Sequence, residues 1–166
     1  MSLLPLPKNP HSVLFVCTGN SCRSVMAEGL FKKIARERGL AVEVRSAGTS
    51  ALEGIGASAE TVRVLKKHGV DAVPHRGRKI TPDLVDRSDV IFVMQNAHRD
   101  YVTALFPDAK DRVYLLSEFY SGEDKQNLAT GIPDPIGMGP DFYENVLEVI
   151  RKSLEGAFAA MQKRPS

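Results

Sequence analysis

The sequence contains little cysteine and no long apolar run. Cys17 and Cys22 are its only cysteines among 166 residues, which excludes the disulfide framework of a small secreted domain and favours a reducing, cytoplasmic environment. No segment approaches the roughly 18 consecutive apolar residues of a membrane span. Residues 1–12 also lack the charged start, apolar run and cleavage site of a signal peptide, so we expect no membrane association.

The chain also has little excess of either charge. Its 22 basic and 20 acidic residues leave a net charge of +2, which argues against nucleic-acid and membrane-surface binding. Its four histidines show no metal-ligand spacing, so we expect neither a metal nor a cofactor. Residues 54–59 match the G-x-G-x-x-A dinucleotide pattern, but they do not directly follow a strand and are interpreted as a loop.

Length and pattern predict one α/β domain. No repeat or linker divides the chain, so we expect an N-terminal tail over residues 1–12 and a single domain over 13–166. Apolar runs predict strands at 13–17, 42–46, 89–94 and 113–116. Helices are expected at about 24–38, after Ser58, after Thr81, between the third strand and Pro107, and after a long polar connection over 117–139.

This alternation of strands and helices predicts a three-layer sandwich. We expect a four-stranded parallel sheet in the order 2-1-3-4, with helices on both faces and a phosphate loop after the first strand. Such sheets bind ligands beyond the carboxyl ends of their strands. The turn after the first strand is therefore the first candidate for a functional site.

That turn, residues 17–24, has the sequence CTGNSCRS, a C-x5-R-S pattern between a strand and a helix. Successive backbone N–H groups in such a turn can converge on one anion, and the helix start adds further donors. Gly19 and Asn20 tolerate the positive φ angles that a tight turn needs. Arg23 offers a planar fork for two phosphate oxygens. The predicted phosphate-binding residues are Thr18, Gly19, Asn20, Ser21, Cys22 and Ser24.

Cys17 is the candidate nucleophile of this loop. A thiolate is favoured near a helix N-terminus and an arginine, and Ser24 is placed to donate a hydrogen bond to the sulfur. Attack on phosphorus would leave a phosphocysteine for water to hydrolyse. The alternative is a buried thiol at a strand end, but the strand, the loop and the following helix together favour the nucleophile.

Asp134 is the candidate proton donor for the leaving group. It lies in the glycine-bearing part of the polar connection, and Pro135 biases its backbone toward an extended conformation. The alternative is an Asp-Pro turn without a catalytic role, and spacing alone does not separate the two.

The loop, the RSAG segment at 45–48, the HRGR segment at 75–78 and the late Asp-Pro pair together resemble the low-molecular-weight protein-tyrosine phosphatase family. The resemblance covers nearly the whole chain from Val13 onward. It implies that Cys17 is the nucleophile, Arg23 the phosphate clamp and Asp134 the general acid and then the general base. It implies, too, that Asn20, Ser46 and His75 hold the loop in shape.

For Cys22 the resemblance implies a reversible disulfide with Cys17 that protects the nucleophile from overoxidation. The alternative is a packing thiol at the helix start.

The sequence departs from the family pattern at two positions. Ile136 follows the Asp-Pro pair where family members acting on phosphotyrosine commonly carry an aromatic residue, and Gln95 stands where an acid is frequent. The loop and the glycines after Asp134 resemble the bacterial protein-arginine phosphatase branch, which typically has threonine in place of Ser21. The expected partner is a phosphorylated protein, with phosphotyrosine as the first expectation and phosphoarginine as the alternative.

Two other functions are less well supported by the residues. Thiol-coupled arsenate reductases use the same fold and loop, but they relay oxidation through later cysteines, and none follows Cys22. A catalytically silent phosphate-binding module would need no acid, so Asp134 argues against it. The sequence does not predict the oligomeric state.

Overall fold

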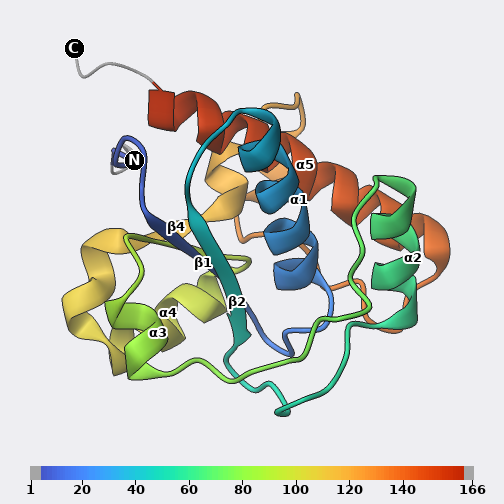
Figure 1. Ribbon diagram of the computed structural model, residues 1–166, viewed down its shortest axis with the longest axis horizontal. Coiled ribbons are helices and arrows are strands. Elements are labelled where there is room, and N and C mark those ends of the chain that lie inside the picture. Colours follow the sequence, from blue (N-terminus) through green and yellow to red (C-terminus); the bar gives the residue numbers. More distant parts are fainter. Residues whose placement is uncertain (1–4, 163–166) are drawn as a thin grey trace.

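A four-stranded parallel sheet in the order β2-β1-β3-β4 lies at the centre of the molecule (Figure 1). The computed structural model describes residues 5–162. The strands are β1 (Ser12–Cys17), β2 (Glu43–Gly48), β3 (Val90–Val93) and β4 (Val113–Leu115). All three pairings are parallel. The predicted strand order and the parallel arrangement are both confirmed.

Helices cover both faces of this sheet, which confirms the three-layer architecture. One face carries α1 (Arg23–Glu37) and α5 (Pro140–Gln162), with α2 (Ala59–Lys67) packed against both helices. The other face carries α3 (Pro82–Asp86) and α4 (Asn96–Leu105) (Figure 1). Short 3-10 helices occupy Pro107–Arg112, Leu116–Phe119 and Lys125–Leu128.

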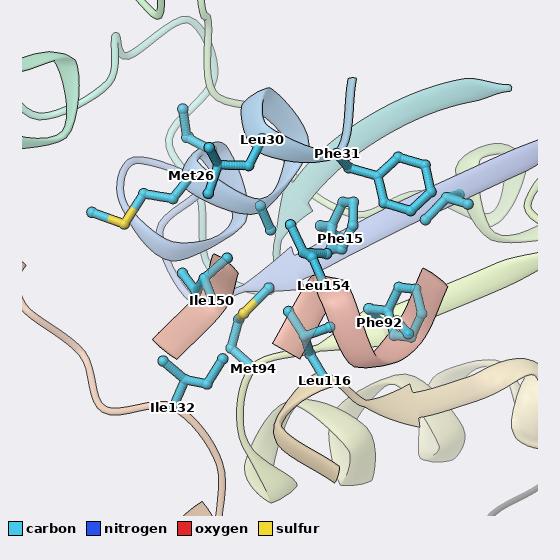
Figure 2. Close-up of a cluster of buried hydrophobic side chains, with 14 of the residues drawn as sticks. Phe15, Met26, Leu30, Phe31, Phe92, Met94, Leu116, Ile132, Ile150 and Leu154 are labelled. Atoms are coloured by element: carbon cyan, nitrogen blue, oxygen red, sulfur yellow. The ribbon is translucent and has the colours of Figure 1, made fainter. Parts of the chain in front are cut away.

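The side chains of β1 alternate between two hydrophobic cores, as the pleat of a strand dictates. Phe15 points toward α1 and α5, where its ring lies 5.7 Å from that of Phe31 and 5.5 Å from that of Phe92 (Figure 2). Leu14 and Val16 point into the second core, beneath α3 and α4. Burying each of these large side chains contributes about 1.5–3 kcal/mol, so β1 is held firmly on both faces.

The predicted helix signals are confirmed. Ser58 Oγ accepts a hydrogen bond from Thr61 N at 3.2 Å and caps α2, and Thr81 Oγ1 accepts one from Leu84 N at 3.2 Å and caps α3. The predicted apolar stripe of α5 is buried; it comprises Tyr143, Val146, Leu147, Ile150, Leu154, Phe158 and Met161.

The strand and helix boundaries differ from the predicted ones by one or two residues. β2 continues to Gly48, because it pairs with β1 as far as Cys17. β3 begins one residue later than predicted, at Val90, which pairs with Val13 of β1; Asp89 N still donates to Ser12 O at 3.1 Å. α1 begins at Arg23, one residue earlier than expected.

The connection over 117–139, predicted to be polar, contributes buried apolar side chains to the core. Phe119 and Ile132 within it are buried in the core beside α5, and Ser117 Oγ donates to Leu128 O at 2.9 Å. This segment is therefore fixed to the domain on both sides of its exposed middle.

Part of the predicted N-terminal tail also packs on the domain. Leu6 is buried, and Tyr114 Oη donates to Pro5 O at 3.0 Å. Residues 1–4 lie outside the described part, and the division at residue 12 stays a prediction. Within residues 5–162, no helix combines the length and the apolar character needed to cross a bilayer.

Candidate active site

The predicted phosphate loop connects β1 to α1. Cys17 is the last residue of β1 and Arg23 the first residue of α1. Because β1 has β2 on one side and β3 on the other, the loop lies where the chain order of the sheet reverses.

The backbone of the loop is oriented as an anion site requires. Its carbonyls are used by neighbouring segments: Cys17 O accepts from Thr49 N at 2.9 Å, Thr18 O from Ser50 N at 2.9 Å, and Ser21 O from Ser58 N at 3.0 Å. By contrast, in the described part of the chain no protein acceptor is recorded for the N–H groups of residues 18–22. The loop therefore offers donors to a ligand and turns its acceptors outward.

Gly48 lets β2 approach this loop closely. A Cβ atom at this position would lie 2.4 Å from Thr18 O, a distance that real Cβ atoms do not show. This close approach explains why the last residue of the RSAG segment is a glycine.

Asn20 is the centre of the loop's support. It is fully buried with φ = 52°, whereas Gly19, for which a positive φ was also expected, does not use one. The side-chain Nδ2 of Asn20 donates to Ser24 Oγ and to Ser46 Oγ, both at 2.9 Å. Its carbonyl oxygen accepts from His75 Nε2 at 2.8 Å. The structure thus brings together the three residues expected to support the loop, Asn20, Ser46 and His75.

A chain of hydrogen bonds runs from this asparagine to the candidate nucleophile. Ser24 Oγ accepts a hydrogen bond from Asn20 Nδ2 and lies 2.9 Å from Cys17 Sγ. Ser46 Oγ also accepts from Asn20 and donates to Glu28 Oε1 at 2.6 Å. Glu28 was not among the predicted site residues, although it lies four residues after Ser24 and therefore on the same face of α1.

Replacing Asn20 by glycine or by alanine separates the two contributions of this residue. Asn20→Gly keeps the positive φ accessible but leaves buried partners unsatisfied, so we expect it to lower the free energy of unfolding by about 2–3 kcal/mol. Asn20→Ala adds about 1 kcal/mol for the left-handed conformation. Urea unfolding of both variants measures the difference, and equal stability would show that the backbone conformation costs nothing.

Arg23 is buried almost completely, with 2% of its surface exposed. Its Nη1 donates to Gln95 Oε1 at 2.7 Å and to Ile132 O at 3.0 Å, and its Nη2 lies 3.5 Å from Asp134 Oδ2. The Asp134 side chain is 41% exposed. Gln95, which stands where an acid is frequent in the family, thus serves as a neutral acceptor that orients the guanidinium.

His98, which was not among the predicted site residues, completes the polar contacts around the loop. Its Nε2 lies 2.8 Å from Thr18 Oγ1, and its Nδ1 accepts from Gln95 N at 3.0 Å. Its position after β3, the strand next to β1, was the available signal. No cluster of three or more potential metal ligands occurs within residues 5–162.

Cys22, within the loop, is buried. Its Sγ donates to Ser58 Oγ at 3.4 Å and lies 3.7 Å from Tyr143 Oη. Burial, and next the contact with Cys22, raise the pKa of Tyr143. Both cysteines are free thiols, and the disulfide implied by the resemblance stays a prediction.

Comparison with known proteins gives consistent matches along the chain. A family model described as low molecular weight phosphotyrosine protein phosphatase matches residues 12–166. The chain is 40% identical over 131 residues to a protein-arginine-phosphatase of Geobacillus stearothermophilus, covering 79% of this chain and 82% of the relative. It is 34% identical over 143 residues to the low molecular weight protein-tyrosine-phosphatase Etp of Escherichia coli (strain K12), covering 86% and 89%.

Solved structures show the same fold. The crystal structure of a low molecular weight protein tyrosine phosphatase from T. tengcongensis superposes with a TM-score of 0.81 at 34% identity, covering 89% of this chain and 97% of that one. An arginine phosphatase structure from Geobacillus stearothermophilus gives a TM-score of 0.80 at 34% identity, covering 92% and 94%.

Proposed function

The chain belongs to the low molecular weight phosphotyrosine protein phosphatase family, and on this premise we propose that it removes phosphate from arginine side chains of proteins. Its family and relatives make it a cysteine-dependent protein phosphatase that acts on phosphorylated proteins. The family's tyrosine phosphatases are phosphoric monoester hydrolases, and phosphoarginine presents the same phosphoryl group on nitrogen. The proposal concerns the phosphorylated side chain and the residues that carry the reaction.

In the first step, the Cys17 thiolate attacks phosphorus. The S–P bond forms as the bond from phosphorus to the arginine nitrogen breaks, and Asp134 gives its proton to that nitrogen. Arg23 and the N–H groups of the loop bind the phosphoryl oxygens. The 2.9 Å contact between Ser24 Oγ and Cys17 Sγ supports this assignment, because a thiolate has no proton and Ser24 then donates to it.

In the second step, water attacks the phosphocysteine. Asp134 accepts the proton of the water, the S–P bond breaks, and inorganic phosphate leaves with the thiolate restored. The 3.5 Å contact between Asp134 and Arg23 supports a carboxylate at the mouth of the loop. The reaction requires a free thiol, so the proposal also places the enzyme in the reducing cytoplasm.

The choice of phosphoarginine rests on two exposed aliphatic side chains in segments that bind the loop or Asp134, which we take as the aliphatic rim of the site. Leu52 is 72% exposed and lies two residues after Ser50, whose backbone N–H donates to Thr18 O of the loop. Ile136 is 63% exposed, and its backbone N–H donates to Asp134 Oδ1. Among the described residues, none of the strongly exposed large hydrophobic side chains is aromatic. An aliphatic rim beside a carboxylate suits the methylene chain and guanidino group of arginine, whereas an aromatic ring gains most from aromatic walls.

Phosphotyrosine is the second candidate. The description of the family model and the name of the relative Etp both favour it. Phosphoarginine is favoured instead by a relative that is 40% identical and is named a protein-arginine-phosphatase.

A side-by-side assay separates these candidates. Three peptides of the same sequence, carrying phosphoarginine, phosphotyrosine or phosphoserine, are compared by kcat/KM from phosphate release. We expect a higher kcat/KM for phosphoarginine. A preference for phosphotyrosine would replace the arginine proposal, and a preference for phosphoserine would reject both. Absence of any turnover would favour a silent phosphate-binding module.

Replacing the proposed acid tests its role separately. We expect Asp134→Asn to lower kcat/KM on the phosphopeptide, which reports the first step, by about 10²-fold, because general acid catalysis typically contributes 10²–10⁴-fold. The loss should be smaller with para-nitrophenyl phosphate, whose leaving group needs less protonation. Asp141→Asn, an exposed acid in the first turn of α5, is the matched control and should keep wild-type kinetics. Equal losses on both substrates would contradict a proton-donor role.

A further inference from the structure

His98 lies between the phosphate loop and the turn that follows β3. It is 4% exposed and occupies the third position of α4, three residues after Gln95. Because β3 is the neighbour of β1 in the sheet, its carboxyl end brings this histidine beside the loop that begins after Cys17.

The hydrogen bonds of His98 define one tautomer. The backbone N–H of Gln95 can only donate, so His98 Nδ1, 3.0 Å away, must be an unprotonated acceptor. The proton of the neutral ring therefore sits on Nε2, 2.8 Å from Thr18 Oγ1, and the ring donates to Thr18. The proton of the threonine hydroxyl is then free to point away from the ring.

The surroundings of the ring keep it neutral. Burial, and next the nearby charge of Arg23, lower the pKa of His98 to about 4, and the opposing effect of Asp134 is smaller. An imidazolium would carry protons on both nitrogens and would face the Gln95 N–H with a second donor. Charge and geometry therefore agree on the same protonation state at neutral pH.

Gln95 connects this histidine to the other end of the loop. Its backbone N–H binds His98, and its side-chain Oε1 accepts from Arg23 Nη1 at 2.7 Å. Thr18, the first residue of the loop, and Arg23, at its end, are thus held by one turn. A change in that turn would shift both ends of the phosphate site.

We propose that His98 is a positioning residue of the phosphatase reaction, which holds Thr18, and with it the start of the phosphate loop, in place relative to Arg23. This inference rests on the proposed function, because it concerns the same site. A misplacement of about 1 Å can cost up to about 10²-fold in rate. The loss of a single tether is therefore expected to lower kcat about tenfold while KM changes little.

Two replacements of His98 separate its hydrogen bond to Gln95 N from its hydrogen bond to Thr18. In His98→Asn the amide oxygen takes the place of Nδ1 and keeps the bond to Gln95 N, but the side chain is too short to reach Thr18. In His98→Gln the amide nitrogen takes the place of Nε2 and reaches Thr18. With para-nitrophenyl phosphate, we expect H98N and T18V each to lower kcat about tenfold, the double variant to lose no more than the worse single variant, and H98Q to recover most of the activity.

Thr81→Ala is the matched stability control. It removes a helix-capping bond from α3 and should lower the melting temperature without changing kcat. The inference would be overturned if the losses of kcat in H98N and T18V multiplied in the double variant. Wild-type kinetics of H98N would overturn it as well. So would a loss of kcat in T81A as large as that in H98N at an equal fall in melting temperature.

The ring itself gives a second test, which does not depend on the variants. Long-range ¹⁵N spectra of the wild-type protein at pH 7 should show His98 protonated at Nε2 and unprotonated at Nδ1. The opposite tautomer or an imidazolium would overturn the inference. If H98N does not fold, an unchanged kcat of T18V would do so as well. A wild-type protein without phosphatase activity would instead reject the proposed function, and the spectra would still test the contact.

Discussion

Replacing Cys17 by serine is expected to lower kcat on the order of 10⁴-fold or more, with both para-nitrophenyl phosphate and phosphopeptides. Loss of a catalytic nucleophile typically has an effect of this size. A serine hydroxyl is a far weaker nucleophile than a thiolate at neutral pH, and nothing in this loop is placed to remove its proton, because Ser24 is itself needed as the donor.

The same variant should still bind phosphate. The Ser24 contact and the N–H groups of the loop remain in place, so the dissociation constant for phosphate, measured by calorimetry, should change by only a few fold. The melting temperature should also stay near that of the wild type, since one sulfur atom is replaced by oxygen. Retention of more than about one per cent of the turnover would point to a different nucleophile.

Labelling of the wild-type protein gives an independent check. Iodoacetamide should modify Cys17 fastest, and inorganic phosphate should slow the reaction because it occupies the loop. Peptide mass analysis identifies the modified cysteine. Preferential labelling of Cys22, or no protection by phosphate, would contradict the assignment.

The fold could be predicted from the sequence because its main signals are local. A wholly apolar strand such as 13–17 requires cover on both faces, and Ser58 and Thr81 have the chemistry of helix caps. The boundary errors came from contacts distant in sequence. β2 continues past its predicted end because Gly48 pairs with Cys17 of β1, and no local pattern carries that information.

In the functional site, too, the residues that are close in sequence could be predicted and the distant ones could not. Cys17 through Ser24 are contiguous, so their roles could be inferred from one motif. Gln95 and His98 were missed as support because they reach the loop across 72 and 80 residues. Their residue types carry no motif, and only the expected adjacency of the first and third strands could have drawn attention to them.

Replacing Arg23 by lysine is expected to lower kcat/KM by about 10³-fold and to destabilise the protein as well. The guanidinium uses one nitrogen for Gln95 Oε1 and Ile132 O and directs the other toward Asp134. A lysine ammonium is a single point of charge and cannot satisfy these partners and also grip two phosphate oxygens. Because the side chain is 2% exposed, the acceptors left without a donor should cost about 1–3 kcal/mol.

A matched variant separates the two effects. Arg151→Lys changes an arginine of α5 that pairs with Glu148 and Glu155 on the same helix, and it should retain kcat/KM within about threefold, because surface pairs contribute about 0–1 kcal/mol. The inhibition constant for inorganic phosphate should rise strongly in R23K and stay constant in R151K. If R23K kept wild-type affinity for phosphate, the guanidinium would have to be a structural tie between Gln95 and Ile132 rather than a phosphate ligand. The loop N–H groups would then bind the oxyanion alone.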